Sequence, residues 1–240
     1  MTDSPVKELT VFFPFYNEEA NIESTTLKAV EVLGRLALDY EIILVNDGSS
    51  DATAEIADRL ASQNEKIRAI HHETNSGYGA ALQTGFRNAT KNWVFYTDGD
   101  GQFDINQIAL LLPLAEKYDI VNGYRQDRQD SPIRKLNAAC WGCFVRAILR
   151  FKARDIDSAF KLYRRAIFDH IDMESTGALI DAEILARANR AGYSLGHIPV
   201  KHLPRTAGTQ TGSNIKVILR AFKELFELRK DILSTPKRLS

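Results

Sequence analysis

Short apolar runs alternate along the first half of the chain with longer segments whose apolar residues recur at helical spacing. Four of these runs have the length of buried strands, at residues 9–14, 40–46, 67–71 and 93–97. The segment after the first run keeps its apolar residues on one helical face, through Ile22, Leu27, Val30 and Leu33. Strands that alternate with helices predict an α/β fold with a mostly parallel sheet and right-handed crossovers.

The second half of the sequence is less regular. We predict helices at residues 105–117, 179–191 and 214–233, strands at 118–121 and 195–200, and a long amphipathic segment at 132–149. With 240 residues the chain is long enough to bury one large core, and we expect a single domain.

Polar and small residues follow the predicted strands at their carboxyl ends. These residues are Tyr16, Asn17, Glu18, Asp47, Asn75, Gly77, Asp98 and Asp100. Because the carboxyl ends of parallel strands share one edge, where open α/β sheets bind ligands, we expect a nucleotide pocket there. The Gly77-Tyr78-Gly79 element is weak support by itself, since it lacks the third glycine of the dinucleotide fingerprint and follows the third strand.

The fourth run ends in two carboxylates separated by one glycine, Asp98-Gly99-Asp100. These acids and the amide oxygen of Gln102 are hard donors that could share one Mg²⁺ or Mn²⁺ ion. An ion held by so few protein ligands completes its shell with water and substrate phosphates, so it would hold a diphosphate. The alternative is an ordinary acidic turn, because Asp and Gly are common at strand ends.

Composition limits the classes of partner and compartment. Lysine plus arginine and aspartate plus glutamate both number 31, so net charge gives no reason to expect nucleic acid as a partner. The two cysteines, Cys140 and Cys143, are too few for a disulfide framework and favour a reducing compartment. The polar start is unlike a signal peptide, and no apolar run approaches the roughly 20 residues that span a bilayer. We expect a cytoplasmic protein, either soluble or peripheral on the cytoplasmic face of the membrane.

Three motifs stand in the order and spacing of a known family. They are Pro14-Phe15-Tyr16-Asn17-Glu18, Val45-Asn46-Asp47-Gly48-Ser49 and Asp98-Gly99-Asp100-Gly101-Gln102. The chain resembles family 2 glycosyltransferases of the GT-A fold, above all the dolichyl-phosphate mannose and polyprenyl-phosphate glucose synthases. The resemblance is specific over residues 9–125 and looser from 157 to 212. It implies a nucleotide-sugar-binding half at 1–125 and an acceptor-binding half with amphipathic helices at 126–240.

The resemblance also implies roles for particular residues. The nucleoside would be held by Pro14, Tyr16, Asn17, Glu18, Val45 and Asp47. The metal and the diphosphate would be held by Asp98, Gly99, Asp100 and Gln102. Arg125, and Arg205 in the late loop Arg205-Thr206-Ala207-Gly208, would close on the phosphates.

The chain departs from the family at two places. Asn46 stands where many relatives carry an aspartate, which bears on the choice of nucleoside. The lysine that relatives carry shortly after the late glycine is replaced by Gln210-Thr211-Gly212-Ser213, which weakens the assignment of the closing loop.

Transfer of a sugar requires charge stabilisation of the leaving nucleoside diphosphate, which a bridging cation supplies. A lipid phosphate acceptor is already ionised and needs no general base, whereas a hydroxyl acceptor requires a carboxylate. The candidate bases are Asp157, Asp181 and Glu183, of which the resemblance favours Asp157, and helical spacing puts the other two on different faces. We therefore expect catalysis to involve Asp100, Asp157 and Arg205.

The function implied is metal-dependent, inverting transfer of a hexose from a nucleotide diphosphate sugar, GDP-mannose or UDP-glucose, to a polyprenyl phosphate at the membrane surface. One alternative is a hydroxyl acceptor on a glycan or glycolipid, and another is a nucleotide-sugar-binding protein without catalysis. A haloacid-dehalogenase-like phosphatase would carry its paired acids on an early strand with Thr or Val where this chain has Gln102. The amphipathic segments at 132–149 and 214–233 would either cap the core or lie on an anionic membrane.

Overall fold

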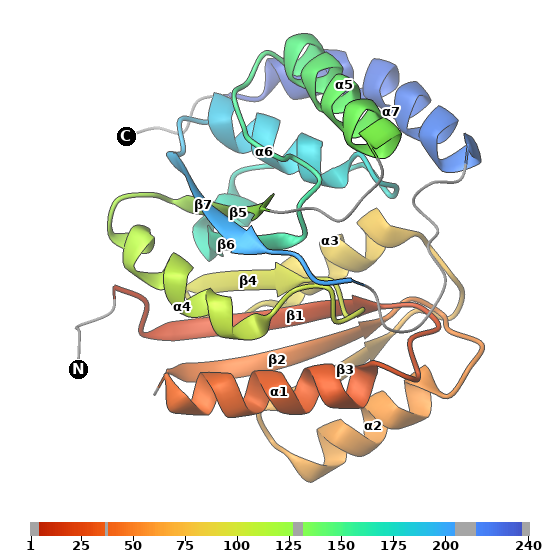
Figure 1. Cartoon of the computed structure of the whole chain (residues 1–240), viewed down its shortest axis with the longest axis vertical. Helices are drawn as coiled ribbons and strands as arrows, with labels where there is room; N and C mark the ends of the chain where they lie inside the picture. The colour runs from red at the N-terminus through yellow and green to blue at the C-terminus, as the bar shows by residue number, and fades with distance from the viewer. Residues whose placement is uncertain (1–4, 37, 127–131, 205–214, 237–240) are drawn as a thin grey trace.

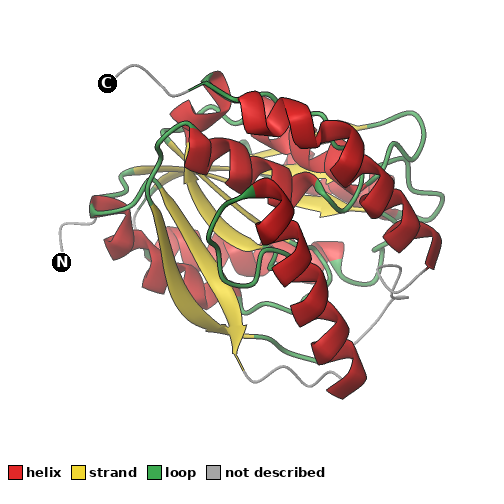
Figure 2. Cartoon of the chain, turned by 90° about the horizontal axis from the view of Figure 1, so that it is seen from above, coloured by secondary structure: helices red, strands yellow, loops and turns green. Residues whose placement is uncertain are grey.

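The four apolar runs of the first half form parallel strands of one sheet, and all but the edge strand at residues 67–71 are almost fully buried. These strands are β1 (Glu8–Phe15), β2 (Asp39–Asn46), β3 (Ile67–His71) and β4 (Trp93–Thr97). The computed structural model describes residues 5–36, 38–126, 132–204 and 215–236. Near-continuous apolar runs are typical of strands covered by helices on both faces, and Figures 1 and 2 show helices on both sides of this sheet.

The second half adds three strands to the same sheet. They are β5 (Ile120–Gln126), β6 (Phe160–Arg164) and β7 (Leu195–Lys201). The strand order in the seven-stranded sheet of the described residues is β3-β2-β1-β4-β6-β5-β7, and β6 runs antiparallel to both of its neighbours. Because β6 pairs directly with β4, one sheet joins the predicted donor and acceptor halves of the chain.

Helices cover the two faces of the sheet in separate groups. The helix bounds are α1 (Ile22–Arg35), α2 (Thr53–Gln63), α3 (Tyr78–Asn88), α4 (Ile108–Leu111), α5 (Pro132–Leu149), α6 (Ile180–Arg190) and α7 (Ile215–Ser234). Val11 and Phe13 of β1 pack with residues of α1, α2 and α4. Phe12 faces the other way and packs in a core shared with α3, α5, α6 and α7. In Figure 1, α5 and α7 lie together on the outside of α6.

Three predictions about secondary structure were wrong in detail. The helix predicted at 105–117 is broken into 3-10 turns at Ile105–Gln107 and Leu112–Glu116 around the short α4, since Pro113 has no backbone N–H to donate. The fifth strand begins at Ile120 instead of 118 and continues to Gln126, so Arg125 lies inside it. The sequence did not predict β6, and the expected start of the last helix at residue 214 lies outside the described residues.

Among the described residues, no helix combines the length and the apolar character required to cross a bilayer.

Candidate active site

The acidic turn after β4 is shaped by tight packing against β1 and α3. A Cβ atom on Gly99 would come closer than 3.0 Å to the ring of Phe15, so only glycine fits between the two acids. Asp98 accepts a hydrogen bond from the hydroxyl of Tyr78 at 3.0 Å, and Asp100 accepts one from the backbone N–H of Gln102 at 3.0 Å. The turn therefore presents two carboxylates, as the sequence predicted, on a rigid support.

The electrostatics of this turn favour a bound cation. Burial, together with the nearby charges of Asp100 and Asp181, raises the pKa of Asp98 to about 7, against the opposing effects of the Tyr78 hydrogen bond and the charge of Lys161. In the described part of the chain, no three His, Cys, Asp or Glu side chains are grouped closely enough to hold a metal ion on their own. The donor set thus fits a cation that two aspartates share with the oxygens of a substrate.

Gln102 connects the acidic turn to the segment after β7. Its side-chain amide donates to the carbonyl of Leu203 at 3.3 Å, and its own carbonyl accepts from the N–H of Leu203 at 2.7 Å. The amide nitrogen is thus engaged with the protein, while a cation would use the amide oxygen. Arg205, two residues beyond Leu203, and the rest of the late loop lie outside the described residues, so their predicted contacts with phosphates stay predictions.

The loops after β1 and β2 are held to each other by hydrogen bonds. Asn17 has a φ of 54°, its N–H donates to the hydroxyl of Ser49 at 2.9 Å, and its side chain accepts from the N–H of Ser50 at 2.8 Å. The N–H of Glu18 donates to the hydroxyl of Thr53 at 2.9 Å. Asn17 and Glu18 therefore help to build the edge where the sequence placed the nucleoside.

The remaining residues predicted to hold the nucleoside differ in how accessible they are. The ring of Tyr16 is exposed, Pro14 is half-buried, and Val45 is fully buried beside Pro14 in the register of β1 and β2. Tyr16 can therefore meet a ligand directly. The buried side chain of Val45 shapes the floor of the edge and leaves only its backbone for direct contact.

Asp47 holds the loop that follows β3. Its carboxylate accepts hydrogen bonds from the N–H groups of Ser76 at 2.8 Å and Gly77 at 2.9 Å, and contacts Nδ1 of His72 at 2.7 Å. The sequence correctly placed Asp47 at this edge but did not identify His72 or Ser76 as its partners. Asp47 positions the start of α3 in this structure, and its predicted contact with a nucleoside stays a prediction.

Asn46, where relatives carry an acid, is satisfied within the protein. Its side-chain oxygen accepts from the N–H of Ser49 at 3.1 Å, and its amide nitrogen lies 3.1 Å from Nδ1 of His71. The other ring nitrogen of His71 lies 3.0 Å from Asp58. The amide of Asn46 can donate to Nδ1 of His71, which leaves the proton of the ring on Nε2 to donate to Asp58. An ionised aspartate at position 46 has no hydrogen to donate and could not form this pair.

Asp157 shares two charged neighbours, Asp181 and Lys161, with Asp98 of the acidic turn. Burial, together with the charges of Asp181 and Asp155, raises the pKa of Asp157 to about 6, against the opposing charges of Arg125 and Lys161. Among the described residues it forms no hydrogen bond or ion pair. The charges of Asp181 and Lys161 thus act on both the predicted metal ligand Asp98 and the predicted catalytic acid Asp157.

Arg125 is clamped by a neighbouring carboxylate. Its guanidinium forms two hydrogen bonds with Asp155, at 2.9 and 2.6 Å, and its backbone N–H donates to the same residue at 2.8 Å. The side chain is largely buried, with 15% exposure. Arg125 can therefore contact a phosphate, as predicted, only if its guanidinium is shared between Asp155 and that phosphate.

The two acids of α6 differ in function. Asp181 is buried and accepts hydrogen bonds from Nζ of Lys161 at 2.6 Å and from the hydroxyl of Tyr96. Glu183 is fully buried and pairs with Arg187 at 2.9 Å, so Glu183 does not face the site. Lys161 is fully buried on β6. The sequence did not identify it as a site residue, because a lysine in a short strand is usually exposed to solvent.

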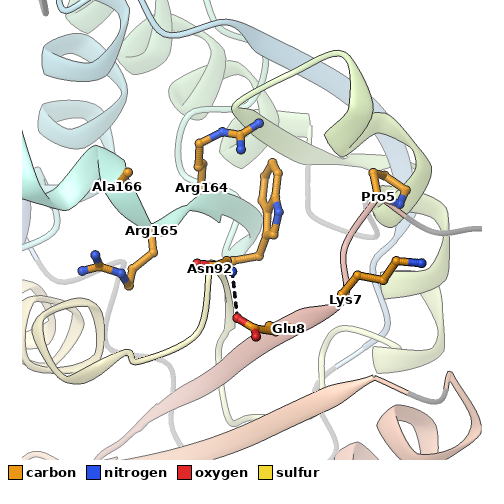
Figure 3. A pocket seen from close by; sticks show the side chains of 8 residues that line it. Pro5, Lys7, Glu8, Asn92, Arg164, Arg165 and Ala166 are labelled. Atoms are coloured by element: carbon orange, nitrogen blue, oxygen red, sulfur yellow. Dashed lines mark hydrogen bonds between the residues drawn. The ribbon is translucent and has the colours of Figure 1, made fainter.

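A cavity of about 400 Å³ lies at the opposite edge of the sheet, where β1 and β4 begin. Figure 3 shows its cationic side chains pointing in different directions. Arg164 pairs with Asp119 at 3.0 Å and Arg165 pairs with Asp169 at 2.9 Å, so their charges are already compensated. We therefore assign the candidate active site to the carboxyl edge.

Comparison with known proteins agrees with this assignment. Residues 10–172 match the family described as Glycosyl transferase family 2. The glycosyltransferase AglD of Haloferax volcanii is 34% identical over 208 residues, which are 82% of this chain and 33% of AglD. The chain thus spans about a third of the length of this curated relative.

Solved structures show the same fold at low sequence identity. The mannosyl-3-phosphoglycerate synthase of Rubrobacter xylanophilus has a TM-score of 0.71 and 16% identity, covering 97% of this chain and 77% of its own. The glucosyl-3-phosphoglycerate synthase of Mycobacterium tuberculosis, in complex with Mg²⁺ and UDP, has a TM-score of 0.69 and 17% identity, covering 96% and 81%.

Proposed function

Because the chain belongs to glycosyl transferase family 2 and has the GT-A fold, we propose that it transfers a hexose, with inversion, from a nucleotide diphosphate sugar to a polyprenyl phosphate at the cytoplasmic face of a membrane. The observation that most supports a sugar-transfer reaction is the Asp98-Gly99-Asp100 turn, which presents two acids at the carboxyl edge of the sheet. In this proposal residues 1–125 bind the donor and residues 126–240 bind the acceptor within one domain.

The donor is a nucleoside diphosphate sugar, UDP-glucose or GDP-mannose, held with Mg²⁺ or Mn²⁺. The mycobacterial glucosyl-3-phosphoglycerate synthase has been solved with Mn²⁺ and UDP-glucose, which supports this donor class for the shared fold. When bound, the cation neutralises charge on the leaving diphosphate. Asp98 and Asp100 would hold it, because their mutual repulsion is relieved by a positive charge.

The state of the carboxylates supports an acceptor that needs no general base. Asp181 is engaged with Lys161 and Tyr96, and Glu183 pairs with Arg187 and accepts from backbone N–H groups. Neither is available to remove a proton from a hydroxyl group. An ionised phosphate attacks without losing a proton, so it fits a site in which two of the three candidate bases serve the protein.

Aromatic side chains exposed on α5 and α7 support a lipid acceptor. The rings of Trp141 and Phe144 of α5 contact those of Phe222 and Phe226 of α7 in edge-on or tilted pairs, at ring-centroid distances of 4.8, 5.5 and 6.3 Å, and we call these four residues the aromatic face. Phe226 is 58% exposed and Phe144 is 36% exposed. Exposed aromatic residues beside Lys223, on a helix with a polar opposite side, are typical of interfacial helices.

A hydroxyl acceptor on a glycan or glycolipid is the second candidate, and Asp157 is the observation that favours it. A carboxylate without a partner, with a pKa raised to about 6, has the properties of a general base. The two candidates predict different results for the same substitution.

If the acceptor is a phosphate, Asp157→Asn should retain kcat within about tenfold, since no proton has to be removed. If the acceptor is a hydroxyl, loss of the base should lower kcat by about 10² to 10⁴. We would measure transfer of radiolabelled sugar from a panel of nucleotide sugars to membrane lipid extract, and identify the product. A large loss with an identified phosphate acceptor would contradict the proposed role of Asp157.

The same variant has a stability effect whose sign follows from the pKa. The folded protein binds the Asp157 proton more tightly than the unfolded chain, where a typical aspartate has a pKa of about 3.9. Stability therefore declines as pH rises from about 4 to about 6, and the loss is complete above that window. Asp157→Asn should raise Tm at pH 7.5 but not at pH 3.5, whereas Asp172→Asn, at an exposed position, should change neither.

If the aromatic face enters a membrane surface, the protein should sediment with anionic liposomes and dissociate as salt rises, because basic residues near such a surface contribute about 1 kcal/mol each and are screened. Replacing Lys223, Arg229 and Lys230 by glutamine should weaken sedimentation. Phe226→Ala should weaken it by roughly tenfold, since burial of a Phe side chain contributes about 1.5–3 kcal/mol.

Leu27→Ala is the matched control for Phe226→Ala, because Leu27 is an exposed apolar residue, 51% accessible, on α1. It should sediment like the wild type. Failure of the wild type to sediment with any liposome composition would contradict the membrane assignment and favour a soluble acceptor or a recruiting protein.

A further inference from the structure

The segment Glu174–Gly177, which we call the 174–177 loop, packs directly against the start of α3. The N–H of Gly79 donates to the carbonyl of Thr176 at 3.0 Å, and the side chain of Gln83 donates to the carbonyl of Ser175 at 3.0 Å. A Cβ atom on Gly77 or on Gly79 would come closer than 3.0 Å to backbone atoms of this loop. The two backbones are thus in contact with no space between them.

The start of α3 carries the contacts that order the donor edge. Ser76 and Gly77 donate to Asp47, and Tyr78 donates to Asp98. Three consecutive residues therefore connect the predicted nucleoside site to the predicted metal site. A shift of the 174–177 loop would therefore reach Asp47 and Asp98 through this short segment.

Buried charges of α6 hold the loop from behind. Glu183 is fully buried, accepts from the N–H groups of Glu174 at 3.1 Å and Ser175 at 2.8 Å, and pairs with Arg187 at 2.9 Å. Burial of a glutamate carries a large desolvation cost, and here the carboxylate is stabilised by hydrogen bonds from the backbone of the loop. The position of the loop is therefore tightly specified.

The last helix reaches the same loop with two polar side chains. Glu224 of α7 accepts from the hydroxyl of Ser175 at 2.7 Å and from Nε of Arg220 at 2.9 Å. Arg220 also donates to the hydroxyl of Thr176 at 2.6 Å. The helix that carries part of the aromatic face is thus joined by hydrogen bonds to the loop that supports the donor edge.

We propose that Glu224 and Arg220 are positioning residues for the donor site, acting through the 174–177 loop on the start of α3. This inference rests on the proposed function for its consequence, which is donor affinity. The path runs from α7 to Ser175 and Thr176, then to Gly79, and from its neighbours Gly77 and Tyr78 to Asp47 and Asp98. Seating of α7 then sets the geometry of the donor site.

Glu224→Gln tests the path without removing side-chain volume. A glutamine is neutral, so it loses the charge that pairs with Arg220, and its single acceptor oxygen cannot replace both carboxylate oxygens, one of which accepts from Ser175 and the other from Arg220. Glu227→Gln is the matched control, because Glu227 lies on the same helix and pairs only loosely with Lys223, at 3.6 Å, away from the loop. Both variants should keep the Tm of the wild type within a few degrees.

We would measure hydrogen exchange of residues 74–80 and binding of UDP and of GDP with Mn²⁺. In Glu224→Gln the amides of residues 76–79 should exchange faster, and the Kd of the bound nucleotide and the donor KM should rise roughly five- to tenfold, the size expected for loss of one typical hydrogen bond. The acceptor KM should stay unchanged, and Glu227→Gln should behave as wild type.

The two measurements separate the inference from the function on which it rests. If the wild type binds neither nucleotide, the proposed function fails, and the exchange of residues 76–79 still decides whether α7 positions this segment. Equal exchange in the two variants would overturn the inference. Faster exchange with unchanged nucleotide affinity in Glu224→Gln would overturn its stated consequence, because the segment would then move without affecting the donor.

Discussion

Replacement of Asp100 by alanine should lower kcat/KM by at least about 10³-fold while leaving the protein folded. The substitution removes a cation ligand, and a bridging cation contributes several kcal/mol to stabilisation of the leaving diphosphate, with a factor of ten for each ~1.4 kcal/mol. The protein should remain folded, because loss of the hydrogen bond that Asp100 accepts from Gln102 N–H at 3.0 Å should cost only about 1 kcal/mol. Transfer assays and Mn²⁺-dependent nucleotide binding measure the effect.

Asp104→Ala is the control in the same segment. Asp104 accepts hydrogen bonds from Asn106 at 3.0 and 2.6 Å and caps a 3-10 turn, so its loss should cost about 1 kcal/mol of stability and little activity. Asp98→Ala and Gln102→Ala should follow Asp100→Ala in decreasing order of severity. Unchanged turnover in Asp100→Ala with stoichiometric metal still bound would refute the metal assignment.

The elements that the sequence predicted correctly are those whose local pattern decides the outcome. The parallel strands β1, β2 and β4 were recognisable because nearly all of their side chains are buried, which leaves an almost uninterrupted apolar run. The acidic turn was recognisable because its chemistry lies within five consecutive residues. Exposure of Leu27 at helical spacing shows that even a correct helix does not fix which apolar residues face the core.

The strand β6 escaped prediction because its buried lysine interrupts the apolar pattern. Lys161 is opposite Tyr96 in the pairing of β6 with β4, and its partner Asp181 lies 20 residues further along the chain on α6. A charge that is buried with its counter-charge cannot be told from a surface charge until the fold brings the two together.

The residues that hold the loops of the site in place could not be predicted from the sequence for the same reason. Asp47 was placed correctly, but its partners Ser76 and Gly77 lie 29 and 30 residues away. Glu183 was a candidate base by position, whereas the structure uses it to hold the 174–177 loop. Local motifs therefore located the candidate site, and the residues that hold its loops in place could be identified only from the tertiary structure.

Replacement of Lys161 by methionine should be the most destabilising of the substitutions considered, by about 3–5 kcal/mol, because it leaves a buried carboxylate without its counter-charge. Lys161 is fully buried, and its Nζ donates to Asp181 at 2.6 Å, to the hydroxyl of Tyr96 at 3.1 Å and to the carbonyl of Ser158. For a chain of this size the loss corresponds to a decrease in Tm of roughly 6–20 °C. Thermal unfolding at neutral pH measures it.

The double variant Lys161→Met with Asp181→Leu identifies the cause of this loss. Removing both charges leaves no unpaired carboxylate, so much of the stability should return, as when buried ion pairs are replaced by apolar residues of similar volume. Lys91→Met, which breaks the more exposed pair with Asp39 at 2.6 Å, should lower Tm by less than about 3 °C. If the double variant were no more stable than Lys161→Met, the loss would come from packing around β6, and the unpaired charge of Asp181 would not be its cause.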